Sequence, residues 1–82
     1  MHFNKILLSK KINYTRHAKN RMRRRRISQA DVNVALKNPD KIKKSNTHKY
    51  VCLKVISKRQ IKVVFIDQTD EVLIITAFDK AN

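Results

Sequence analysis

The residues best suited to chemistry in this sequence lie in one basic run, residues 16–26, which holds His17 and six arginines. A histidine takes up or releases a proton near neutral pH, and a guanidinium group donates two parallel hydrogen bonds to a phosphate. Cleaving RNA through its own 2′-hydroxyl needs both, because a proton moves while negative charge gathers on the phosphoryl oxygens. The run therefore indicates a phosphate-binding surface, and metal-independent RNA cleavage is one reaction that its residue types could support.

Helical spacing would bring several of these side chains together. His17, Arg21 and Arg24 follow one another at intervals of four and three residues and would share one face of a helix, with Arg25 on its flank. We take His17, Arg21 and Arg25 as candidate catalytic residues. The other candidates, expected to bind RNA, are Arg16, Lys19, Arg23, Arg24, Arg26, Thr76, His48 and Tyr50.

Each of these signals has a structural alternative. A run of like charges is usually a solvated surface, and a histidine near the start of a helix is more often a surface or packing residue than a catalyst. Thr76 interrupts an apolar strand, where a half-buried and satisfied hydroxyl is the more common role. No metal site is expected, because the three histidines lack ligand spacing and the six acidic residues are dispersed. No cofactor is expected either, since a chain without glycine cannot form a glycine-rich phosphate loop.

The composition favours a polyanionic partner. The 82 residues include 20 Lys and Arg against six Asp and Glu, a formal net charge of +14. A net charge of roughly 2 to 8 is enough to keep a small domain soluble, so the excess positive charge needs another explanation. The sequence contains no apolar run of transmembrane length and no secretion signal, and its lone Cys52 has apolar neighbours typical of a core residue. We therefore expect a cytoplasmic protein that binds no membrane.

Two helices and then a sheet are predicted. Thr15 and Ser28 are suitable N-caps for helices over about 16–26 and 29–37, and Asn38-Pro39 ends the second. Residues rich in β-branched side chains predict strands over 50–56, 61–66 and 72–78, with a possible edge strand at 41–45. Residues 1–13 are expected to form an N-terminal arm or edge strand. Without glycine, any left-handed turn must be made by Asn, Asp or a strained residue.

These elements predict a single α+β domain over residues 1–82, with two N-terminal helices packed on a three- to four-stranded antiparallel sheet. The strands at 61–66 and 72–78 are almost continuously apolar and should be central. A dimer through an exposed sheet edge near residues 41–57 has no support beyond the edge itself, because lysines there would oppose strand pairing.

The motif His17-Ala18-x-x-Arg21-Met22-x-x-Arg25-x-Ile27-Ser28, with Asp31-Val32 and the later strand Ile74-Ile75-Thr76-Ala77-Phe78, is similar to that of a widespread family of small bacterial domains of unknown function. That family resembles the RelE-like ribonuclease toxins. The likeness covers roughly residues 13–79, so that residues 14–79 would form the toxin domain.

The resemblance implies the fold shared by RelE-like and barnase-like toxins. It also implies that His17, Arg21 and Arg25 are recurrent polar positions of the family, with Thr76 a weaker fourth. One residue departs from the pattern: Arg26 stands where the family commonly has a small residue, often glycine. A left-handed helix end at Arg26 would cost roughly 1 kcal/mol.

Three functional hypotheses remain open. The first is a metal-independent endoribonuclease toxin that inhibits translation by cutting RNA, with the ribosome as one context for cleavage, and that an acidic antitoxin protein restrains. The second is a non-catalytic nucleic-acid-binding module in which His17 is structural. The third is an interaction domain for an acidic protein. Phosphate contacts alone do not distinguish RNA from DNA, so the choice of RNA rests on the resemblance.

Overall fold

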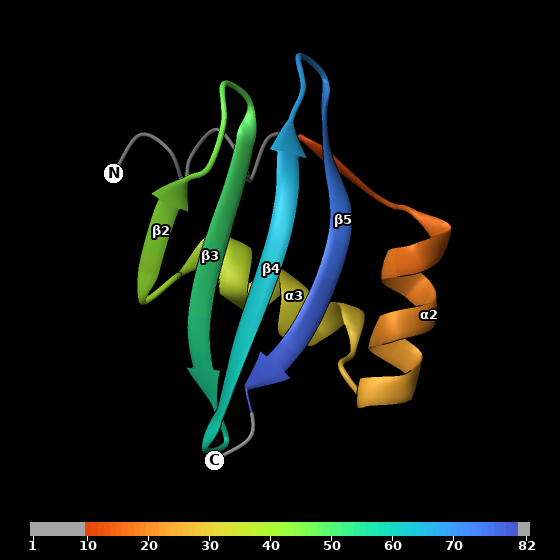
Figure 1. The fold of residues 1–82 in the computed structure, drawn as a ribbon, viewed down its shortest axis with the longest axis vertical. Helices are drawn as coiled ribbons and strands as arrows, with labels where there is room; N and C mark the ends of the chain where they lie inside the picture. Colours follow the sequence, from red (N-terminus) through yellow and green to blue (C-terminus); the bar gives the residue numbers. More distant parts are fainter. Residues whose placement is uncertain (1–9, 81–82) are drawn as a thin grey trace.

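The extended half of the chain forms one sheet together with a short strand from the beginning of the chain (Figure 1). The computed structural model describes residues 10–80. The strands are β1 (Lys11–Tyr14), β2 (Lys41–Lys44), β3 (Lys49–Ile56), β4 (Arg59–Asp67) and β5 (Glu71–Lys80), arranged in the order β1-β5-β4-β3-β2. The strands predicted from β-branched residues are confirmed as β3, β4 and β5. As expected, β4 and β5 are interior strands, with β4 in the middle of the sheet.

The sheet has one more strand than expected, and it is not purely antiparallel. Strand β1 pairs with β5 in parallel, with Lys11 opposite Glu71 and Tyr14 opposite Ile74. The edge strand predicted within residues 1–13 therefore forms only at the C-terminal end of that range, as β1. Residues 1–9 fall outside the described residues. The pairing joins segments about 60 residues apart, so nothing in the local pattern of β1 indicated its partner or direction.

The two helices begin and end where local hydrogen bonds dictate. Helix α2 (Arg16–Arg25) begins after Thr15, whose hydroxyl accepts a hydrogen bond from the N–H of Ala18. Helix α3 (Gln29–Lys37) begins after Ser28, which forms a reciprocal capping box with Asp31. Both predicted caps are confirmed, and α2 is one residue shorter than predicted because Arg26 leaves the helical region.

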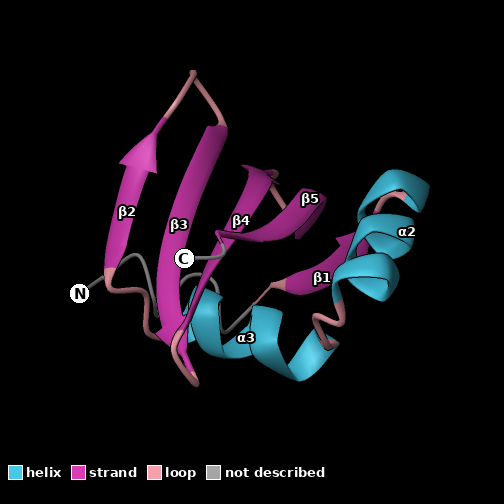
Figure 2. Cartoon of the chain, turned by 60° about the horizontal axis from the view of Figure 1, so that its bottom comes forward, coloured by secondary structure: helices cyan, strands magenta, loops and turns pink. Residues whose placement is uncertain are grey.

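Each helix covers a different part of the sheet. Helix α3 packs across one face, against β3 and β4, while α2 packs against β5 (Figure 2). The core between helices and sheet consists of Ala18, Met22, Ile27, Val32, Ala35, Leu36, Cys52, Ile61, Val63, Phe65, Val72, Ile74 and Ala77. Cys52 is buried as expected, and burial raises the pKa of its thiol to about 12. A thiol so rarely ionised at neutral pH is a packing group, not a nucleophile.

The face of the sheet opposite α3 has no helix over it among the described residues. We call it the open face. Val51, Leu53, Val64 and Thr76 belong to it, because the residues that alternate with them point into the core.

Neither described helix has the length and apolar character needed to cross a bilayer.

Candidate nucleic-acid interface

A β-bulge in β5 fixes the start of the basic helix. Val64 pairs with Thr76 and Phe65 with Ile74, so Ile75 is an extra residue in β5. Thr15 binds at this point, with its N–H donating to the carbonyl of Ile74 and its hydroxyl donating to that of Ile75, each at 3.0 Å. Helix α2 therefore begins at the middle of β5.

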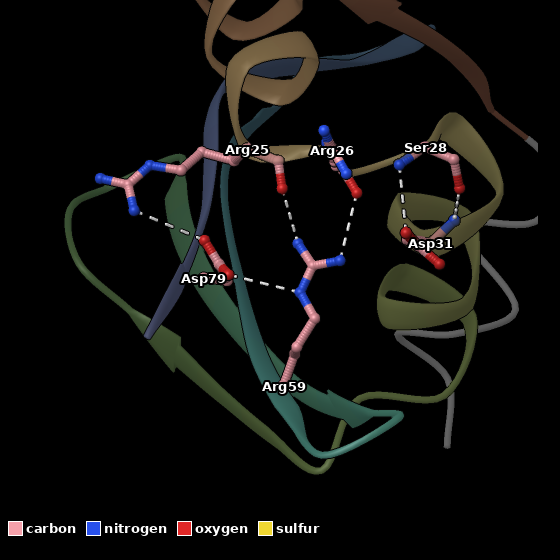
Figure 3. A network of polar contacts seen from close by, with 6 residues as sticks. All are labelled: Arg25, Arg26, Ser28, Asp31, Arg59 and Asp79. Carbon is pink, nitrogen blue, oxygen red and sulfur yellow. Dashed lines mark hydrogen bonds and ion pairs between the residues drawn. The ribbon is translucent and has the colours of Figure 1, made fainter. Parts of the chain in front are cut away.

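Arg59 fixes the other end of α2 (Figure 3). Its two terminal nitrogens donate to the carbonyls of Arg26 and Arg25, at 3.1 and 2.8 Å, and its Nε lies 3.3 Å from Asp79 Oδ2. The last carbonyls of a helix have no partner within the helix, so a cation from the β3–β4 hairpin both satisfies them and opposes the helix dipole. Because α2 is held at Ile75 and again beside Asp79, it runs alongside β5.

Burial of Ala18 and Met22 determines where the basic side chains of α2 point. At 100° per residue, His17, Arg21 and Arg24 occupy one flank of the buried stripe, and Arg16, Lys19 and Arg23 occupy the other. The first group is the face that the sequence predicted. His17 and Arg24 are exposed, whereas Arg21 is half-buried.

Phe78 explains why Arg21 is half-buried. The guanidinium carbon of Arg21 lies 5.5 Å from the centre of the Phe78 ring, a cation–π distance. Phe78 pairs with Lys62 in β4 and alternates with the buried Ala77, so its ring belongs to the open face of the sheet. The contact therefore places a charge from α2 at the edge of the open face.

Three arginines of α2 surround a shallow hollow of about 230 Å³, which we call the arginine hollow. Its lining residues are Arg21, Arg24 and Arg25. Of these three arginines, only Arg25 has a described carboxylate within ion-pair distance, 3.6 Å from its Nη1 to Asp79 Oδ1. Asp79 also pairs with Arg59, so one negative charge serves two guanidinium groups, and Arg21 and Arg24 have no counter-ion among residues 10–80. Such a site attracts an anion.

The remaining helical candidates are placed as follows. Arg25, predicted to be catalytic, is an ion-pair partner of Asp79 and leaves 48% of its side chain exposed. His17 is exposed one turn before Arg21, and no described residue forms a hydrogen bond with it. Arg16, Lys19 and Arg26 are exposed, and Arg23 donates a hydrogen bond to Asn20.

Thr76 lies beside the bulge, on the same face of β5 as Phe78. Its hydroxyl oxygen is buried and has no hydrogen-bond partner among the described residues. The expected satisfied hydroxyl is therefore not what the structure shows. A buried polar atom without a partner costs about 1–3 kcal/mol, so Thr76 remains a candidate for contact with a ligand.

The structure does not bring His48 and Tyr50 to the arginine hollow. Tyr50 stacks on Phe65 on the side of the sheet that α3 covers, with ring centres 5.5 Å apart. His48 precedes β3, and its backbone carbonyl accepts a hydrogen bond from the N–H of Asp67, beside the acidic turn between β4 and β5. A shared site with His17 would have required both side chains on the open face beside α2, and the strand register places Tyr50 on the other face.

The residues that position or extend this site were not predicted from the sequence. Phe78, Arg59 and Asp79 act through contacts with α2, and the lysines of the open face follow strand alternation. Alternation was the available signal, since Lys62 and Thr76 interrupt strands that otherwise read as continuously apolar. It could not be used without knowing which face of the sheet the helices cover.

Comparison with known proteins gives one match. Residues 14–79 match the sequence profile of a family described as a domain of unknown function, DUF4258. The chain belongs to the DUF4258 family. Neither the curated proteins nor the solved structures yield a significant match.

The DUF4258 match includes every residue of the arginine hollow. It begins at Tyr14, the last residue of β1, and ends at Asp79, the partner of Arg25 and Arg59. The interface and the contacts that hold α2 in place therefore lie within the part of the chain that defines the family.

Proposed function

We propose that this DUF4258 domain binds RNA through α2, with phosphates held in the arginine hollow. The observation that carries the proposal is the concentration of three guanidinium groups around one hollow. Asp79 is the one carboxylate in the described part of the chain that pairs with any of them, and it also pairs with Arg59. Self-repulsion among these charges favours neutralisation by an outside anion, and release of counterions makes each phosphate contact favourable at low salt. The formal net charge of +14 supports the same kind of partner.

We further propose that the bound RNA is cut, in the manner of the RelE-like toxins that the motif resembles. His17 would transfer the proton of the attacking 2′-hydroxyl or of the leaving oxygen, while Arg21 and the exposed part of Arg25 would stabilise charge on the phosphoryl oxygens. No metal takes part in this reaction. An acidic antitoxin protein would neutralise the same basic surface and block access of RNA.

One observation favours binding without cleavage as the second candidate. A general base is normally oriented by a hydrogen bond to its other nitrogen, and no described residue provides one for His17. In that case the arginine hollow grips phosphate and His17 is only a surface residue. Substrate contact would have to orient the ring for the first candidate to hold.

Binding and cleavage are separated by testing three variants on the same labelled RNA with a metal chelator present. The double variant Arg21→Ala/Arg24→Ala should weaken binding at least tenfold and lower the salt dependence of binding by about one to two phosphate contacts. His17→Ala should abolish fragments ending in a cyclic or 3′-phosphate while binding stays within about threefold of wild type.

The matched control is Lys19→Ala/Arg23→Ala, which removes the same charge from the opposite flank of α2. A smaller loss than in the hollow variant is expected. Equal losses on both flanks would contradict a defined hollow, and intact RNA with wild-type protein would leave only the binding function. Competition with DNA of the same sequence tests whether the 2′-hydroxyl matters.

A further inference from the structure

A groove on the open face of the sheet is separate from the arginine hollow, and the two share no lining residue. Its volume is about 490 Å³. We propose that this groove, which we call the lysine groove, binds an unpaired segment of the RNA whose phosphate is held in the arginine hollow. This inference rests on the proposed function and specifies its substrate as single-stranded RNA.

Strand register links the groove to α2 through one row of residues. Phe78 of β5 pairs with Lys62 of β4, Lys62 with Leu53 of β3, and Leu53 with Lys41 of β2, so these residues form one row across the open face. Arg21 lies over Phe78 at the end of that row. A strand of RNA leaving Arg21 can therefore continue along the row without turning around an edge of the protein.

A second row runs beside the first and joins Thr76, Val64, Val51 and Lys43. Its β5 end is Thr76, whose buried hydroxyl oxygen has no partner among the described residues. The two rows together give the groove an apolar floor, Val51 and Leu53, with lysines from β2 and β4 around it.

The charge of the lining fits one kind of occupant. Lys41, Lys43, Lys62 and Lys80 line the groove, and no carboxylate is among its lining residues. Flexible ammonium groups around a floor suit a backbone of repeated phosphates, which they can follow without a fixed geometry. A small uncharged ligand would use neither the lysines nor their spread over β2, β4 and β5.

The apolar floor distinguishes an unpaired strand from a duplex. Val51 and Leu53 gain from contact only if bases lie flat or edge-on against them, and bases in a duplex are stacked inside it. Neighbouring strands lie about 4.8 Å apart, so three strand steps from Phe78 to Lys41 span about 14 Å. That distance accommodates a short run of a few nucleotides, within the range of other sheet-based single-strand binders.

The test compares a labelled single-stranded RNA with the same RNA annealed to its complement, by fluorescence anisotropy near 0.1 M salt. Wild type should prefer the single strand. Lys43→Ala/Lys62→Ala should weaken single-strand binding at least tenfold, reduce its salt dependence, and change duplex binding by less than about threefold.

The matched control is Lys37→Ala/Lys44→Ala. It removes the same charge from exposed positions that do not line the groove, and Lys44 is adjacent to Lys43 in β2 but points to the other face. This control should bind single-stranded RNA within about threefold of wild type. Thermal unfolding of every variant establishes that the fold is intact before affinities are compared.

Three results would overturn the inference. If the groove variant keeps wild-type affinity while Arg21→Ala/Arg24→Ala loses it, the proposed function stands and the lysine groove does not bind RNA. If the wild type binds duplex as well as single strand, or if an acidic protein but no RNA occupies the groove in crosslinking, the substrate assignment fails. If both double variants keep wild-type RNA binding, the proposed function itself is contradicted.

Discussion

Arg26 adopts a left-handed backbone conformation, φ 55° and ψ 46°, at the end of α2. The N–H of Ile27 donates to the carbonyl of Met22 at 2.8 Å, and the N–H of Arg26 to that of Arg23 at 3.3 Å. This is the Schellman pattern, and the buried Met22 and Ile27 make the apolar contact that usually accompanies it. The geometry is normally assigned to glycine because a Cβ atom clashes there.

At the residue scale, we predict that Arg26→Gly stabilises the domain. The change removes the strain at a left-handed position, so the free energy of unfolding should rise by about 0.5–1 kcal/mol and the melting temperature by several degrees. The measurement is thermal or urea unfolding at moderate salt. As a control, Arg24→Gly, inside α2, should lower stability by about 1 kcal/mol. A loss of stability in Arg26→Gly would mean that the Arg26 side chain contributes more than its backbone costs.

At the element scale, α2 depends on contacts from outside itself. Arginines are crowded on its surface and repel one another, so the sequence of α2 contributes little to the stability of the helix. Thr15 holds its start against the bulge in β5, and Arg59 with Asp79 holds its end. The arginine hollow therefore keeps its shape only while both ends stay attached.

We predict that Arg59→Ala loosens the last turn of α2. Two helix carbonyls and one carboxylate lose their donor, so stability should fall by about 1.5–3 kcal/mol, and amide exchange should quicken most in residues 22–27. Arg59→Lys should rescue this only in part, because an ammonium cannot reproduce the fork of donors. Lys37→Ala, at the end of α3, is the control and should leave exchange in α2 unchanged. Uniform exchange across the chain would show that Arg59 has no specific role at α2.

At the scale of the whole molecule, charge is distributed unevenly. Asp67, Asp70 and Glu71 lie together at the turn between β4 and β5, away from the arginines. Asp40 accepts a hydrogen bond from the N–H of Val55, which holds the pKa of its carboxyl below the ordinary value. Asp79 is the one described carboxylate that forms an ion pair with an arginine of α2, and it pairs there only with Arg25.

This imbalance predicts a trade between stability and binding. Arg24→Gln should raise the melting temperature at low salt, because it relieves repulsion among neighbouring arginines, and the gain should shrink as salt screens the charges. The same change should weaken RNA binding by removing a phosphate contact. Unfolding curves at about 0.02 and 0.3 M salt, beside binding data, check both halves. No stabilisation at low salt would indicate that the arginines are already neutralised within the protein.

Local physics made much of the fold predictable. The caps at Thr15 and Ser28 bond to groups three residues away, and Pro39 constrains its own neighbour, so both helices could be located in sequence. The β-branched runs likewise marked the three long strands β3, β4 and β5. The helical face of His17, Arg21 and Arg24 followed from periodicity alone, because the number of residues per helical turn does not depend on what the helix packs against.

Only the tertiary structure decided how these parts meet. Thr15 binds Ile75 and Arg59 binds the end of α2 across long stretches of sequence, and β1 pairs with β5 across nearly the whole chain. Such contacts depend on which faces are buried together, and the sequence of a short strand such as β1 does not indicate which strand it pairs with. The arginine charges are set by the sequence, whereas the hollow forms only once β5 has positioned α2, and the groove forms only once the strands have paired.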